Sequence, residues 1–130
     1  MLINKELLDK VSSEAKQNQR LRMNFNFHDS LDAPSQRLLN ALEPGTVIPI
    51  HRHKTTSETY IILRGKMRLS FYDKDGRIIE SVILCSDTEN IGYNIPKGQW
   101  HSLDVLVPDT VIFEVKDGPY MPIKEDDILR

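Results

Sequence analysis

The N-terminal residues carry apolar side chains at helical spacing. Leu7, Leu8, Val11 and Ala15 form a narrow apolar stripe on a segment that is otherwise mostly polar. Asn4 precedes the stripe and is a favourable N-cap residue. Because the polar face mixes both charge signs, we expect the stripe to pack on the rest of the protein, or on a second subunit, and not on a membrane. The pattern predicts one amphipathic helix.

From residue 36 onward the hydrophobic pattern changes to the alternation that is typical of strands. Residues 43–46 fit a type II turn, and residues 73–76 have the composition of a turn between two strands. The segment 36–42 has a pattern that suits a helix equally well. The sequence predicts an all-β fold behind one helix, arranged as a run of hairpins. The other predicted strands cover residues 58–64, 66–71, 77–84, 91–95, 100–107 and 110–116.

Composition narrows the class of protein. With 17 basic and 19 acidic residues, the formal net charge is -2, and no basic stripe indicates a nucleic-acid partner. Cys85 is the only cysteine, so no internal disulfide forms and a reducing cytoplasm is the expected location. No apolar run is long enough for a signal peptide or a membrane span. We expect one domain, with residues 1–35 as helix and arm and residues 36–130 as the main body with its C-terminal tail.

Three of the four histidines lie in two short segments bounded by glycine. Residues two apart on a strand project from one face, so His51 and His53 are expected to point to the same place. Glu58 is out of phase with them, and the polar residues 54–57 are expected to form a loop that resets the phase. A turn at residues 96–98 then presents His101 from a distant strand. A single histidine is more often structural than a ligand, but the four residues together predict a site for one divalent transition metal.

The ligand set leaves the metal open among iron, manganese, nickel and zinc. Four protein ligands complete a tetrahedral zinc site, which is then closed. A six-coordinate iron, manganese or nickel ion keeps two positions for water or for a substrate. In each case three neutral imidazoles and one carboxylate leave the ion with a net charge of roughly +1. The site therefore favours an anionic or enolisable ligand.

The two histidine segments resemble the two motifs of the cupin superfamily. Residues 45–65 match the first motif, Gly-(five)-His-x-His-(three or four)-Glu-(six)-Gly, at every specified position. Residues 96–101 match the Pro-x-Gly-x-x-His centre of the second motif, although Asn90 and Val105 replace the glycine and the asparagine at its ends. More narrowly, the chain is similar to the WbuC family of cupin-fold metalloproteins. The segments that carry this similarity are residues 22–28, 36–45, 51–58 and 113–120.

This resemblance implies a single cupin-type barrel, which is a double-stranded β-helix or jelly roll, with the N-terminal helix packed on it. It favours a strand at residues 36–42, and it implies a homodimer and an association with cell-surface polysaccharide gene clusters. Glu114, Lys116 and His28 become candidate catalytic residues, although a solvated strand face is the alternative for Glu114 and Lys116. The candidate substrate-binding residues are Arg22, Asn24, Asn26, Arg37, Tyr60 and Tyr120.

Three functions fit this pattern. The first is a metal-dependent enzyme that acts on a small polar metabolite, such as a sugar or a sugar nucleotide in surface polysaccharide biosynthesis. The second is a non-catalytic, metal-dependent binding module or sensor for such a molecule. The third is an iron-dependent cupin of the dioxygenase type, which needs open positions on the metal. All three require the same four metal ligands, so the ligand set is the common prediction.

Overall fold

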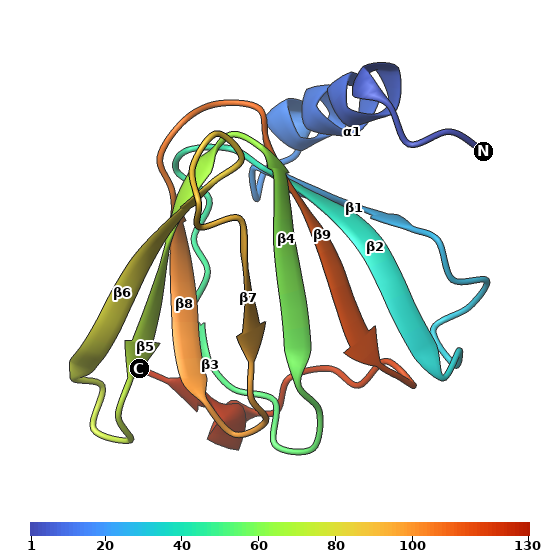
Figure 1. Cartoon of the computed structure of the whole chain (residues 1–130). Coiled ribbons are helices and arrows are strands. Elements are labelled where there is room, and N and C mark those ends of the chain that lie inside the picture. The colour runs from blue at the N-terminus through green and yellow to red at the C-terminus, as the bar shows by residue number, and fades with distance from the viewer.

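The computed structural model describes all residues 1–130 and contains one α-helix and two five-stranded antiparallel sheets (Figure 1). In the first sheet the strand order is β1-β2-β9-β4-β7, and in the second it is β10-β3-β8-β5-β6. The all-β prediction is therefore confirmed, including a strand at residues 36–42. The elements are α1 (Lys5–Gln17), β1 (Arg22–Asn26), β2 (Ser35–Leu42), β3 (Ile50–His51), β4 (Glu58–Arg64), β5 (Lys66–Tyr72), β6 (Ile78–Cys85), β7 (Gly92–Ile95), β8 (Trp100–Val105), β9 (Thr110–Asp117), η1 (Glu125–Asp127) and β10 (Ile128–Leu129).

Helix α1 begins where the sequence predicts and lies at one end of the first sheet, beside β1 and β2 (Figure 1). The side chain of Asn4 accepts a hydrogen bond from the backbone N–H of Leu7 at 3.0 Å, so it caps the helix. The predicted apolar stripe packs on the outer face of the sheet, where it forms a core separate from the barrel interior. This outer core consists of Leu8, Val11, Ala15, Leu39, Ala41 and Val111.

Consecutive strands mostly alternate between the two sheets, and here the prediction of successive hairpins is wrong. The turn at Gly65 joins β4 in the first sheet to β5 in the second. Gly65 has φ +89°, and a Cβ at this position would clash with Thr110. Of the predicted pairs, β5 and β6 do form a hairpin through residues 73–76. The crossings between sheets produce the barrel of a jelly roll.

The interior has an apolar end and a polar end. Ile62 on β4 and Ile112 on β9 face inward near Gly65 and belong to a ten-residue apolar core. At the other ends of these two strands, Glu58 lies beside Lys116. Along both strands the inward face changes from apolar to charged. Side chains that could bind a ligand or transfer a proton therefore lie at the end of the barrel opposite Gly65.

The C-terminal tail closes on this polar end of the barrel. Strand β10 pairs with β3, with Ile128 opposite His51. The side chain of Asp127 pairs with Arg52 at 3.0 Å and with Lys54 at 3.4 Å. The tail is thus attached to the residues on both sides of His53. None of the helices is long and apolar enough to cross a membrane.

Candidate metal centre

The four predicted ligands come from both sheets. His51 on β3 lies directly opposite His101 on β8, and Glu58 is the first residue of β4 in the other sheet. Strand β3 ends at His51, so His53 lies in the following loop and not on the same strand, which corrects the expectation drawn from their spacing. The backbone carbonyl of His53 accepts a hydrogen bond from the N–H of Gly98 at 2.7 Å. This bond fixes the loop against the turn that presents His101.

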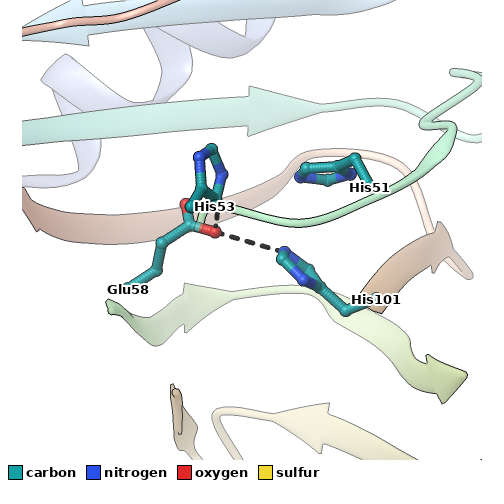
Figure 2. A group of neighbouring side chains, drawn as sticks. All are labelled: His51, His53, Glu58 and His101. Atoms are coloured by element: carbon teal, nitrogen blue, oxygen red, sulfur yellow. Dashed lines mark ion pairs between the residues drawn. The ribbon is translucent and has the colours of Figure 1, made fainter. Parts of the chain in front are cut away.

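The side chains of His51, His53, Glu58 and His101 converge on one point (Figure 2). One potential ligand atom from each lies within 4.8 Å of all the others. Oε1 of Glu58 is 3.0 Å from Nε2 of His53 and 3.1 Å from Nε2 of His101. The rings of His51 and His101 are tilted by 51° relative to each other, with centroids 4.3 Å apart. The spatial grouping expected from the two motifs is therefore present.

Backbone carbonyl groups set the tautomers of two of these histidines. Nδ1 of His51 lies 2.8 Å from the carbonyl oxygen of Pro49, and Nδ1 of His101 lies 2.9 Å from that of Gln99. A carbonyl oxygen only accepts hydrogen bonds, so each Nδ1 carries the hydrogen. Each Nε2 is then left with a lone pair that is free to coordinate a metal.

This protonation pattern tests whether the residues fit a metal. Nε2 of His101 and Oε1 of Glu58 are buried and have no hydrogen-bond partner, although they lie 3.1 Å apart. With a neutral imidazole both atoms are acceptors, so their approach is unfavourable unless a positive charge lies between them. A divalent cation satisfies both atoms at once. The donor set of three imidazoles and one carboxylate therefore fits a transition metal.

The electrostatics of the cluster agree with that fit. Burial raises the pKa of Glu58, but the adjacent His101 and His53 outweigh burial and hold this pKa well below its ordinary value. Burial, followed by the neighbouring His101, lowers the pKa of His51 to about 4. At neutral pH the glutamate is ionised and His51 is neutral. These are the forms in which the two side chains bind metal.

A cavity of about 310 Å³ adjoins the centre, and we call it the tail cavity. Its wall includes His53, the rest of the 52–56 loop, the end of β9 and the C-terminal tail. Four basic residues line it, against two acidic residues, Asp117 and Asp127. The basic residues are Arg52, Lys54, Lys116 and Lys124. The wall of the tail cavity therefore carries an excess of positive charge.

A second, smaller pocket of about 80 Å³ lies on the inner face of β1, β2 and β9, and we call it the arm pocket. It contains all three candidate catalytic residues and three of the candidate substrate-binding residues. Lys116 lines both this pocket and the tail cavity. The six predicted residues that meet in the arm pocket are Asn24, Asn26, His28, Glu114, Lys116 and Tyr120.

The remaining candidates lie elsewhere. Arg22 sits at the far end of β1, where its Nη1 donates to the carbonyl of Val47 at 2.9 Å. Arg37 is exposed on β2, whose inward positions are Gln36 and Leu38, so alternation turns Arg37 outward. Neither arginine reaches the two pockets.

Tyr60 and Glu114 lie between the metal ligands and the arm pocket. Tyr60 is buried, and its hydroxyl donates to Oε2 of Glu58 at 3.4 Å. Burial, together with the negative charge of Glu58, raises the pKa of Glu114 to about 7. Asn40, which the sequence analysis did not select, donates to Oε1 of Glu114 at 3.4 Å. Its signal was the alternation that places residues 36, 38 and 40 on one face of β2.

Comparison with proteins of known structure supports the fold. KdgF from Halomonas sp. superposes with a TM-score of 0.59 and 15% identity, over 78% of this chain and 81% of that chain. The cupin domain of Cnp3 from Schizosaccharomyces pombe superposes with a TM-score of 0.58 and 11% identity, over 76% of this chain and 66% of that chain. The capsular polysaccharide assembling protein CapF from Staphylococcus aureus superposes with a TM-score of 0.60 and 19% identity, over 77% of this chain and 30% of that chain.

At these identities the likeness shows the fold alone, which is the cupin-type jelly-roll barrel that the motifs predict. No protein with curated annotation matches the sequence. One family model, described as a domain of unknown function, DUF6016, matches residues 3–84, which include α1 and three of the four candidate ligands. Because the match spans more than half of the sequence, this chain belongs to the DUF6016 family, here folded as a cupin barrel.

Proposed function

We propose that the protein binds one divalent transition metal through His51, His53, Glu58 and His101, and uses it to bind and transform a small anionic metabolite. One observation carries this proposal: Nε2 of His101 and Oε1 of Glu58 are buried, lie 3.1 Å apart and have no hydrogen-bond partner. In the neutral form of His101 the proton is on the opposite nitrogen, where the carbonyl group of Gln99 accepts it. A cation between Nε2 and Oε1 then satisfies both atoms.

The tail cavity supports the choice of an anionic metabolite. Its volume is within the range of small-molecule sites, and His53 forms part of its wall, so a molecule bound there is next to the metal. Lys116 and Lys124 lie at its surface and take part in none of the ion pairs of the chain. These ammonium groups are free to attract negative charge, so an anionic ligand should bind in the cavity more tightly than a neutral one.

The chemistry that we propose is proton transfer at an oxygen-bearing carbon of the metabolite. A bound metal supplies Lewis acidity, which polarises a ligand oxygen. Glu114 is the proposed proton carrier, because a carboxyl group with a pKa of about 7 both donates and accepts near neutral pH. Asn40 holds the carboxyl group of Glu114 in place, and Tyr60 does the same for Glu58.

For the metabolite we propose a sugar or sugar nucleotide of surface polysaccharide biosynthesis. The resemblance of four sequence segments to the WbuC family supports this class. The name of CapF, a capsular polysaccharide assembling protein, is in line with it, although the chain spans less than a third of CapF. Membership of the WbuC family stays a prediction, as does the homodimer, which sedimentation analysis over a range of concentrations checks.

Metal content tests the proposal first. The chain is purified without a polyhistidine tag, and bound metals are quantified by mass spectrometry. We expect about one equivalent of metal in the parent protein. A variant that combines His53→Ala with Glu58→Ala should contain none, because two of the four proposed ligands are lost. His28→Gln is the matched control, since it changes the one histidine outside the cluster and should retain the metal. Stoichiometric metal in the double variant would refute the ligand assignment.

Reactivity then separates the three functions. Cobalt-loaded protein is titrated with sugars, sugar acids and sugar nucleotides while its visible absorption is followed. A spectral change shows that the ligand reaches the metal, and turnover of that ligand, lost in Glu114→Gln, identifies an enzyme. Binding without turnover identifies a sensor or binding module. Oxygen-dependent absorption changes in iron-loaded protein identify the dioxygenase type. A tetrahedral cobalt spectrum that no added anion alters would contradict an open site.

A further inference from the structure

His28 is buried, with 7% of its surface exposed, and its ring lies against the backbone of Arg37. Nδ1 of His28 is 3.0 Å from the backbone nitrogen of Arg37 and 3.1 Å from its carbonyl oxygen. Nδ1 therefore has a partner in either neutral tautomer, as an acceptor from the N–H group or as a donor to the carbonyl group. His51 and His101 differ, because the partner of each Nδ1 is a carbonyl oxygen. A ligand that accepts a hydrogen bond can thus select the tautomer with the hydrogen on Nε2, while Nδ1 of His28 keeps its bond from Arg37.

Nε2 of His28 is buried and has no hydrogen-bond partner. Leaving such a polar atom unpaired is unfavourable, so a polar partner is expected in the space that it faces. That space is the arm pocket, whose volume of about 80 Å³ exceeds the share of about 30 Å³ that one water molecule occupies in the liquid. The pocket therefore has room for a small polar group in contact with His28.

A positive charge lies in the same pocket. Lys116 projects from β9 into both cavities, and it takes part in none of the ion pairs of the chain. Its ammonium group lies 5.8 Å from the centre of the Tyr120 ring, a weak contact that leaves its hydrogens available. By contrast, the side-chain amide of Gln36 already donates to the carbonyls of Leu31 and Ala33. The unused donors of the pocket are thus the ammonium group of Lys116, which alone carries a charge, Nε2 of His28 and the amides of Asn24 and Asn26.

We propose that the arm pocket binds a carboxylate group, with Lys116 supplying the charge and Nε2–H of His28 supplying a directed hydrogen bond. A carboxylate is small enough for the pocket and carries the single negative charge that one ammonium group balances. The carboxyl group of Glu114 also lines the pocket, and it would repel a dianionic phosphate more strongly than a carboxylate. The group that this pocket recognises is therefore a carboxylate, such as that of a sugar acid.

The proposed carboxylate site is argued from the residues of the arm pocket alone. It rests on the proposed function only in one respect, namely that the same acid also reaches the metal. Lys116 connects the two cavities, so an acid held here can extend from the arm pocket toward the tail cavity. Carboxylate binding is measured on metal-free protein, so the result is informative even if the protein proves to bind no metal.

The probes are acetate, its neutral isostere acetamide, and inorganic phosphate. Each is titrated into metal-free, nitrogen-15-labelled protein, and the Nε2–H signal of His28 and the backbone amide signals of β1 and β9 are followed. We expect acetate to shift these signals saturably, and acetamide to have little effect because it lacks the charge. Phosphate should bind more weakly than acetate. Equal shifts with acetate and acetamide, or tighter binding of phosphate, would overturn the carboxylate assignment.

Two pairs of variants assign the contacts. Lys116→Met should weaken acetate binding by about tenfold or more, because it removes a charged hydrogen-bond partner. Lys66→Met makes the same change on β5, at the opposite end of the barrel, and should have no effect. His28→Gln keeps a donor near the position of Nε2, whereas His28→Asn keeps only the acceptor toward Arg37. Acetate should therefore bind to His28→Gln better than to His28→Asn. Equal affinities within both pairs would refute the site.

Discussion

Two buried groups near the metal centre should give the metal-free protein opposite responses to acid, and single substitutions should reveal each of them. His51 has its pKa lowered by burial to about 4 from an ordinary value of 6.5. Glu114 has its pKa raised by burial, and by the charge of Glu58, to about 7 from 4.5. The first group resists protonation in the folded state, and the second favours it. Stability as a function of pH therefore contains two terms of opposite sign.

For His51, the unfolded chain takes up a proton below pH 6.5 while the folded protein does not until about pH 4. Acid therefore favours unfolding over this range, and stability falls by about 2 kcal/mol between pH 8 and pH 5. For Glu114, the folded protein takes up a proton near pH 7 and the unfolded chain only near pH 4.5. Acid favours folding here, and stability rises by about 2.5 kcal/mol over the same interval.

The assay is urea denaturation of metal-free protein in a chelator at several pH values between 8 and 5. The parent protein should show a nearly flat profile, because the two terms largely cancel. Glu114→Gln removes the stabilising term and should lose about 2 kcal/mol on going to pH 5. His51→Asn removes the destabilising term and should gain a similar amount. If the two variants show parallel profiles, the assignment of opposite protonation preferences to these buried groups is wrong.

Three further perturbations test the scaffold. Gly65→Ala should destabilise the protein by more than about 2 kcal/mol in urea denaturation, because φ is +89° and the added carbon clashes with Thr110 on β9. Gly76→Ala is the control: φ is +81° but the added carbon meets nothing, so the cost should be about 1 kcal/mol. Asp127→Asn removes the charge that pairs with Arg52 and helps to hold β10 on β3, so hydrogen exchange of the β10 amides should accelerate about fivefold. Unchanged exchange would contradict the role of this ion pair in attaching the tail. Tyr60→Phe should weaken metal affinity by about tenfold in a chelator competition, because Glu58 loses the hydrogen bond from the tyrosine hydroxyl. Unaltered affinity would show that this hydrogen bond does not support metal binding.

The grouping of the four candidate ligands, and most of the strands, could be predicted because their signals are local. The apolar alternation of residues 58–64 and 66–71 gives their strands directly, and histidine is scarce enough that its clustering is informative. The sequence does not state which sheet receives a strand after a turn. Gly65 was recognised as a turn, but the pairing of β4 with β9 and β7 depends on contacts between distant segments. Local patterns therefore located the elements better than their partners.

Strand β1 was missed for a different reason, which also bears on the arm pocket. Its apolar residues Met23 and Phe25 pack under α1, while Asn24 and Asn26 are exposed on the opposite face, where they line the arm pocket. The usual expectation places apolar residues on the inner face of a barrel strand, so this edge strand has the reverse polarity. The arrangement is possible because the helix covers the apolar face. A segment that looks like an arm in sequence is thus a strand that presents amides to a pocket.

The spacing of the first motif has a structural explanation in this crossing topology. The chain between His53 and Glu58 has to pass from the second sheet to the first, and packed sheets lie about 10 Å apart. Five steps along an extended chain reach about 17 Å, so four intervening residues span the gap with some slack, and three would still reach. The bond from Gly98 to the carbonyl of His53 fixes the start of this crossing segment. Glycine at position 98, where φ is +82°, therefore serves both segments: it shapes the turn before His101 and it fixes the loop that carries His53.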